Sequence, residues 1–242
     1  MYALETVDLT KKYGDLTAVD QLNIRVHKGE LFSLLGVNGA GKSTTIKMLS
    51  CLTQPTSGDG YLKGKSICKE PDAVKSMIAV SPQETAIAPG LSVYENLELI
   101  CGIYGFAKEK QRQKIKELTD LLGLHPVVGK KAGKLSGGWQ RRLSIAMALI
   151  SEPEILFLDE PTLGLDVLAR SDLWDLIRSL KGNVTIILTT HYMEEAEALS
   201  DRIAIMKDGK LLICDTPENI KKTAETDNIQ EAFVRIIKGV EK

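Results

Sequence analysis

Short apolar runs separated by polar turns dominate the first part of the chain. Residues 2–9 alternate loosely between apolar and polar side chains, and residues 17–26 place three aliphatic side chains on one side. This alternation predicts two half-buried strands, which we expect to form an N-terminal antiparallel β subdomain. Residues 31–35 are almost continuously apolar, which predicts a short strand that is buried on both faces.

The middle segment, about residues 90–150, has a helical period instead. Ser92-Val93-Tyr94-Glu95 is a capping-box pattern and precedes a helical run over 96–104. A second helix is predicted over 108–122, with a stripe formed by Ile115, Leu118, Leu121 and Leu122. Because helix follows helix here, we expect an inserted α-helical subdomain.

Strand and helix alternate again after residue 153. The predicted elements cover 155–158, 167–180, 184–189, 192–199 and 202–206. Short apolar strands that alternate with helices imply an α/β fold with a mostly parallel sheet. The last residues, about 217–242, are expected to form a small helical appendage.

Composition and charge restrict the class of protein. The chain has 242 residues, of which 43% are hydrophobic and 26% charged, and its formal net charge is −1. These values are ordinary for a soluble globular protein, and the charge favours no nucleic-acid partner. No apolar run approaches the ~18 residues of a membrane span, and the first residues lack the pattern of a secretory signal. We therefore expect a cytoplasmic chain that reaches a membrane only through a partner.

The cysteines do not indicate a metal site. They are Cys51, Cys68, Cys101 and Cys214, without C-x-x-C spacing. This usage is typical of a reducing compartment.

One segment predicts the bound ligand directly. It reads Gly36-Val37-Asn38-Gly39-Ala40-Gly41-Lys42-Ser43 and fits the pattern G-x-x-x-x-G-K-[ST] at every fixed position. It lies between the buried strand at 31–35 and a helical run at 44–49, which is the context that a phosphate-binding loop requires. Backbone N–H groups of such a loop surround nucleotide phosphates, Lys42 can reach the β- and γ-phosphates, and the Ser43 hydroxyl can ligate Mg²⁺. The alternative is a glycine-rich turn before an ordinary helix.

Two further segments are weaker on their own. Ile155-Leu156-Phe157-Leu158 ends in Asp159 and Glu160, and a buried strand that ends in carboxylates is where an α/β sheet places its ligand site. Asp159 can hold Mg²⁺, and Glu160 can accept a proton from an attacking water; an acidic turn after a strand is the alternative. In Leu135-Ser136-Gly137-Gly138, Ser136 is a good N-cap for a helix through Ile150, and that helix N-terminus is a second possible anion site.

Together these segments resemble the ATP-binding subunit of ABC transporters. The phosphate loop, Gln83, Leu135–Gly138, Asp159-Glu160 and His191 follow one another in the order of that family, over nearly the whole chain. The Leu-Ser-Gly-Gly tetrapeptide separates this family from other proteins with a phosphate loop. The phrases at 191–197 and 227–234 look most like bacterial exporter-type members that handle drugs, lipids or ions.

Other positions match the family, and one departs from it. Tyr13 lies where these proteins place an aromatic residue against adenine, 161–166 looks like the D-loop, and 189–191 looks like the switch-histidine segment. The family usually has glutamine where this chain has Trp139. That departure affects neither Ser136 nor the glycine amides.

The resemblance implies a fold, a reaction and partners. The fold is a P-loop NTPase core, and residues 1–242 form a single nucleotide-binding domain. Two such chains, either identical or related, enclose two ATP molecules, and each site takes Gly36–Thr44 from one chain and Ser136–Gly138 from the other. The middle helices at 92–122 dock an integral-membrane permease near Gln83, on the inner face of the membrane.

Catalytic roles also follow from the resemblance. Glu160 is the general base, and His191 orients the water and the γ-phosphate. Gln83 senses Mg²⁺ and the water, and Asp166 communicates across the dimer. Taken alone, a histidine after a strand is more often structural, Gln83 is ordinarily a loop residue, and Tyr13 could simply pack on the sheet.

Two rival functions stay open on the sequence. A soluble ABC ATPase acting on nucleic acid or ribosomes usually carries two ATPase units, long coiled coils or zinc insertions. This chain has one unit, no heptad run and no cysteine cluster, and its charge is near neutral. A nucleotide sensor that does not hydrolyse ATP is disfavoured by the Asp159-Glu160 pair.

Overall fold

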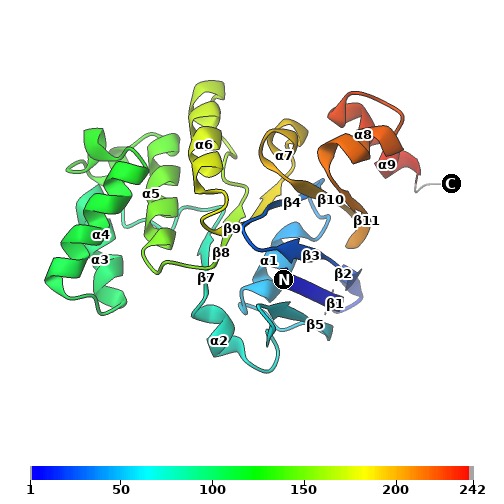
Figure 1. The fold of residues 1–242 in the computed structure, drawn as a ribbon, viewed down its shortest axis with the longest axis horizontal. Coiled ribbons are helices and arrows are strands. Elements are labelled where there is room, and N and C mark those ends of the chain that lie inside the picture. Colours follow the sequence, from blue (N-terminus) through cyan, green and yellow to red (C-terminus); the bar gives the residue numbers. More distant parts are fainter. Residues whose placement is uncertain (1, 240–242) are drawn as a thin grey trace.

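A computed structural model describes residues 2–239, in which two β-sheets and nine helices pack together (Figure 1). The strands are β1 Tyr2–Tyr13, β2 Leu16–Leu22, β3 Arg25–His27, β4 Leu31–Gly36, β5 Ser57–Leu62, β6 Lys65–Ser66, β7 Ile78–Ser81, β8 Ile155–Asp159, β9 Thr185–Thr190, β10 Arg202–Lys207 and β11 Lys210–Asp215. The α-helices are α1 Lys42–Leu49, α2 Pro71–Lys75, α3 Val93–Ile103, α4 Lys108–Leu121, α5 Gly137–Leu149, α6 Val167–Leu180, α7 Met193–Leu199, α8 Pro217–Thr223 and α9 Ile229–Gly239.

The larger sheet has the order β11-β10-β4-β9-β8-β7. All neighbouring pairs are parallel except β10 and β11, so the expected mostly parallel sheet is confirmed. Consecutive side chains of a strand point to opposite sides of the sheet, and apolar clusters cover both sides of its central strands. Ile155 and Phe157 pack on one side of the sheet, and Leu156 and Leu158 on the other.

The smaller sheet is the expected N-terminal antiparallel one. It has the order β2-β1-β5-β6, with β3 paired to the other half of β1. The prediction of one strand over 17–26 was wrong, because two strands form there. Register shifts interrupt β1 around Asp8, which has a φ of 48°, so β2 pairs beyond this point and β3 before it.

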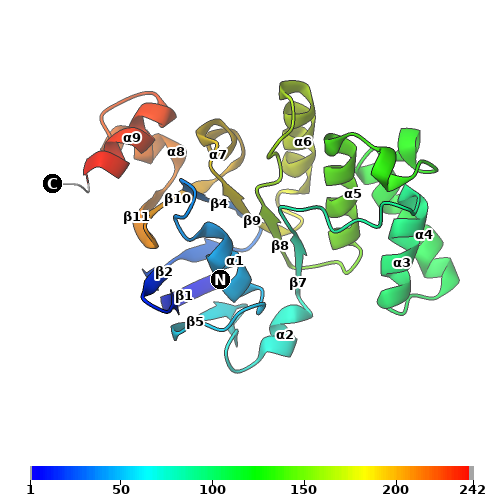
Figure 2. The ribbon, with the colours of Figure 1, turned by 180° about the vertical axis from the view of Figure 1, so that it is seen from behind.

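Helices α3, α4 and α5 lie at one end of the molecule, and α8 and α9 lie at the other (Figures 1 and 2). The capping box at the start of α3 is present, since Ser92 accepts from the Glu95 N–H and Glu95 accepts from the Ser92 N–H. The predicted stripe on α4 was wrong at Leu121, which is the last residue of the helix and is exposed, while Leu122 is buried.

Several elements were not predicted from the sequence, namely β5, β6, β7, β11 and α2. The expected appendage at 217–242 contains α8 and α9, and its residues 240–242 lie outside the described part of the chain. Among residues 2–239, no helix has both the length and the apolar character needed to cross a membrane.

Candidate nucleotide-binding site

The register of the parallel sheet brings the candidate residues to one edge. Leu35 of β4 is paired with Thr190 of β9, and Asp159 of β8 with Thr189. The four parallel strands β4, β7, β8 and β9 therefore end side by side, and their carboxyl ends carry the phosphate loop, Gln83, Glu160 and His191. A ligand site outside the carboxyl ends of the strands is the usual arrangement in such sheets.

The phosphate loop requires glycine at two positions for steric reasons. A Cβ on Gly36 would lie 2.5 Å from the Met206 carbonyl oxygen, and a Cβ on Gly41 would lie 2.4 Å from the Ala18 carbonyl oxygen. Gly41 also has a left-handed φ of 101° and is the N-cap of α1. The loop consequently packs tightly against β2 and β10 while the N-terminus of α1 stays open to an anion.

Lys42 is a buried charged residue in the site. Only 5% of the residue is exposed, and its Nζ donates to the carbonyl oxygens of Gly36 (2.8 Å) and Val37 (3.2 Å). Burial lowers the pKa of Lys42, although the carboxylates of Glu160 and Asp159 oppose the shift. The Lys42 Nζ lies 3.6 Å from Glu160 Oε1.

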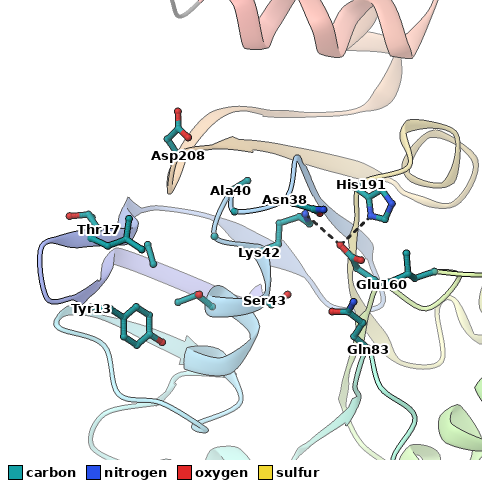
Figure 3. Close-up of a pocket in the computed structure, with 16 residues that line it drawn as sticks. Tyr13, Thr17, Asn38, Ala40, Lys42, Ser43, Gln83, Glu160, His191 and Asp208 are labelled. Carbon is teal, nitrogen blue, oxygen red and sulfur yellow. Dashed lines mark ion pairs between the residues drawn. The ribbon is translucent and has the colours of Figure 1, made fainter.

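Asp159 and Glu160 have different partners. Asp159 Oδ1 accepts from Ser43 Oγ (3.1 Å) and from Thr189 Oγ1 (2.5 Å). Glu160 has a φ of 47°, so the chain leaves the strand there. Its carboxylate lies between Lys42 and His191, whose Nδ1 is 3.2 Å from Glu160 Oε1 (Figure 3).

The residues present fit a magnesium ion held mainly by a nucleotide. Within residues 2–239, no group of three or more His, Cys, Asp and Glu side chains is placed to bind a metal. Mg²⁺ commonly takes only one or two protein ligands together with phosphate oxygens and water. The Ser43 hydroxyl and the Asp159 carboxylate, which are in direct contact, provide such a pair.

Two supporting residues were missed in the sequence. Thr189 Oγ1 donates to Asp159 and accepts from the Glu160 N–H (3.0 Å), so it fixes both acidic residues. Arg141 on α5 is buried and donates to the carbonyl oxygens of Pro82 (2.6 Å) and Gln83 (2.7 Å). The threonine at the end of a predicted strand was a usable signal, whereas nothing in the pattern pointed to Arg141.

The phosphate loop and the carboxyl ends of the neighbouring strands border a cavity of about 630 Å³ (Figure 3). Eleven of the predicted site residues line it, namely Tyr13, Asn38, Gly39, Ala40, Gly41, Lys42, Ser43, Thr44, Gln83, Glu160 and His191. The sequence did not identify the other five, which are Leu16, Thr17, Ala18, Leu163 and Asp208. Tyr13 lies on the far side of the cavity from His191 and is 48% exposed, and the Lys11 ammonium lies over its ring at 5.0 Å from the centroid.

Seven predicted site residues do not line this cavity, namely Gly36, Val37, Ser136, Gly137, Gly138, Asp159 and Asp166. Ser136, Gly137, Gly138 and Asp166 lie where α5 and α6 begin. Cβ atoms on Gly137 and Gly138 would lie 3.1 Å from Leu165 and 3.2 Å from Ala169, so the start of α5 packs closely on the segment around Asp166. Ser136 occupies the N-cap position but makes no side-chain capping bond, whereas Asp166 accepts from the Ala169 N–H.

Comparison with known families agrees with this geometry. The family described as ABC transporter matches residues 19–163, which is more than half of the chain. This chain belongs to the ABC transporter family. A shorter match, to the AAA domain described as a putative AbiEii toxin of type IV toxin–antitoxin systems, covers residues 131–196.

Two relatives are named as ATP-binding proteins. The probable multidrug ABC transporter ATP-binding protein YbhF of Escherichia coli K12 is 38% identical over 99% of this chain and 42% of its own length. The daunorubicin/doxorubicin resistance ATP-binding protein DrrA of Streptomyces peucetius is 39% identical over 91% of this chain and 67% of its own length. This chain therefore spans less than half of the first relative.

Solved structures share the whole fold. The ATP-binding subunit of an ABC transporter superposes with a TM-score of 0.84 at 27% identity, covering 97% of this chain and 99% of that one. A dimeric ATP-binding cassette in a post-hydrolysis state with ADP and Pi has a TM-score of 0.77 at 28% identity, covering 88% and 98%. The predicted P-loop NTPase core is thus confirmed.

Two glycine substitutions separate backbone conformation from steric contact. Gly39 and Gly41 both have positive φ, but a Cβ on Gly39 would meet nothing within 4 Å. We expect Gly39→Ala to lower the free energy of unfolding by about 1 kcal/mol and to retain nucleotide binding. Gly41→Ala should weaken the binding of a fluorescent ATP analogue at least tenfold (on the order of 1.4 kcal/mol) because the loop must move away from Ala18. Equal effects of the two variants on binding would contradict this assignment.

Proposed function

We propose that this chain is the ATP-binding and ATP-hydrolysing part of an ABC transporter. It would pair with a second ABC ATPase unit around two ATP molecules. The pair would drive a membrane permease, and export is the expected direction of transport. The main observation behind this proposal is that one cavity is lined by Lys42, Ser43, Gln83, Glu160 and His191. A cytoplasmic location at the inner face of the membrane follows from this role, and residues 1–242 would act as one nucleotide-binding domain.

Binding of the triphosphate relies on three features of the loop. The N-terminus of α1 presents unpaired N–H groups and the positive end of the helix dipole. The Lys42 ammonium would exchange its two carbonyl partners for the β- and γ-phosphates. Tyr13 has an exposed ring across the cavity from these groups, where it would stack on adenine.

Ser43 and Asp159 would hold Mg²⁺ together with the phosphates, with Gln83 facing the same cavity. The ion would supply charge neutralisation on the transferring phosphoryl group. Thr189 keeps the Asp159 carboxylate oriented through its hydroxyl.

Glu160 is the candidate general base. Its side chain is buried and lies between the Lys42 ammonium and the His191 imidazole. In this position it would accept the proton of a water that attacks the γ-phosphate. His191 would orient that water and the phosphate, and Arg141 would keep Gln83 in place through the backbone.

The position of the Leu135–Gly138 segment supports a site shared between two units. Ser136 and Gly137 are exposed at the start of α5 and lie outside the chain's own cavity. A helix N-terminus on the surface can bind an anion that a second unit presents. The solved relative with ADP and Pi is a dimer, and the exposed Asp166 beside the signature would communicate across the equivalent interface.

A groove outside the nucleotide cavity supports permease docking. A groove of about 350 Å³ lies between β7, α3 and α5, and its lining includes Pro82, Ile100, Ile103, Tyr104 and Met147. Ile103 is 70% exposed, which is costly for an aliphatic side chain that never meets a partner. The groove adjoins the Gln83 segment, so a helix seated there would be coupled to the nucleotide site. YbhF is named as an ATP-binding protein of a multidrug ABC transporter and DrrA as a drug-resistance ATP-binding protein, and neither name supports the alternative of action on nucleic acid or ribosomes.

The base assignment is tested by Glu160→Gln. This variant should bind ATP normally, lose turnover by about 10²–10⁴-fold because proton acceptance is removed, and accumulate an ATP-bound dimer on gel filtration. Glu154→Gln is the matched control, since Glu154 lies just before the same strand, exposed and paired with Lys63. Normal hydrolysis by Glu160→Gln would refute the assignment.

The shared site is tested by Ser136→Arg. The substitution places a long cation on the exposed helix start, so it should block dimer formation and leave ATP binding by the monomer intact. Titration calorimetry on the monomer and light scattering with Glu160→Gln as background measure the two quantities. Loss of ATP binding by the monomer would mean that Ser136 belongs to the chain's own site.

Docking in the groove is tested by Ile103→Asp. A buried carboxylate at an apolar interface is strongly unfavourable, so the variant should no longer co-purify with its permease from detergent-solubilised membranes, while ATP binding is retained. Leu52→Asp is the control, because Leu52 is also 70% exposed but lies outside the groove. Retention of the permease by Ile103→Asp would exclude this surface.

A further inference from the structure

The imidazole of His191 is not oriented by a hydrogen bond at Nδ1. This nitrogen is buried and, in the described part of the chain, has no hydrogen-bond partner, although Glu160 Oε1 lies 3.2 Å away. The ring instead packs on its neighbour Tyr192, with the two ring centroids 4.1 Å apart and the planes inclined by 41°. Tyr192 is therefore a direct packing partner of the imidazole.

Tyr192 also contacts a charged residue of helix α6. The Arg170 guanidinium on α6 lies over the Tyr192 ring at 4.3 Å from its centroid, a cation–π contact. The Tyr192 N–H donates to Thr190 Oγ1 (2.9 Å), which anchors the backbone at the end of β9. Arg170, Tyr192 and His191 thus form a continuous stack from α6 to the carboxylate of Glu160.

A buried carboxyl on α7 links this helix to α6 and to the segment after β8. Glu195 is fully buried, and its Oε1 accepts from Thr162 Oγ1 (2.7 Å) and from Trp174 Nε1 (3.0 Å). Its other oxygen and Arg170 Nε both lack a hydrogen-bond partner among the described residues. Burial raises the pKa of Glu195, and its hydrogen bonds and the charge of Arg170 oppose this shift.

We propose that Tyr192 and Arg170 are positioning residues, which hold the His191 imidazole against Glu160 and link it to helix α6. This inference rests on the proposed function, because it assumes that His191 acts during ATP hydrolysis. Asp166 is the N-cap of helix α6, and the start of this helix lies beside the exposed Ser136 and Gly137. A shift of α6 on pairing with a second unit would move Arg170, and through Tyr192 it would reach the histidine.

The experiment is steady-state hydrolysis of Mg-ATP by the 242-residue chain, with kcat and KM determined for each variant. Tyr192→Ala and Arg170→Met should each lower kcat about tenfold, because a displacement of about 1 Å at a reacting group is costly. KM for ATP should change by less than about twofold, since neither residue lines the nucleotide cavity. Tyr192→Phe keeps the ring and should retain more than about half of the wild-type kcat.

The matched control is Arg178→Met on the same helix, where Arg178 is exposed and paired with Asp175. It should behave as wild type, and thermal unfolding of every variant shows that it is folded. If Tyr192→Ala does not fold, Arg170→Met decides alone.

The outcomes separate a failure of this inference from a failure of the proposed function. Wild-type kcat in Tyr192→Ala or Arg170→Met, an equal loss in Tyr192→Phe and Tyr192→Ala, or a change confined to KM would each overturn the inference. In those cases a hydrolysing wild type and an inactive Glu160→Gln would leave the proposed function intact. A wild-type chain that does not hydrolyse ATP would overturn both.

Discussion

The parallel pairing of β4, β8 and β9 is the constraint on which the site depends. Hydrogen bonds between parallel strands fix their register, and here Leu35 is opposite Thr190 while Asp159 is opposite Thr189. Three segments that are far apart in the sequence therefore end at one edge of the sheet. Since both faces of these strands are buried in apolar cores, a slip in register would bury polar residues, and the arrangement is rigid.

This rigidity allows charges to be placed where water is scarce. Lys42 and Glu160 are both buried and lie 3.6 Å apart. Burial lowers the pKa of Lys42, and its present partners are only carbonyl oxygens in addition to that carboxylate. A site of this kind gains strongly when a polyanion enters, because the ammonium then acquires full countercharges in a region of low dielectric constant.

The same fold exposes groups that its own cavity does not use. Ser136 and Asp166 lie at the starts of two adjacent helices, outside the nucleotide cavity, and the groove beside α3 exposes Ile103. In the proposed function these are the surfaces for a second ATPase unit and for the permease. The stack from Arg170 to His191 would connect the first of these surfaces to the reacting groups.

The sequence by itself determined the local chemistry. Fixed spacing within one short segment specifies the loop at 36–43, and an almost continuous apolar run specifies the strand at 31–35 that presents it. The pattern failed at residues 17–26, because an irregularity in β1 decides how β2 and β3 pair. Only the tertiary structure decided which distant groups support the site. Thr189 contacts Asp159, Arg141 supports Gln83, and Arg170 stacks on Tyr192. These contacts join different strands and helices, so they are fixed by packing and register and leave no periodic signal along the chain.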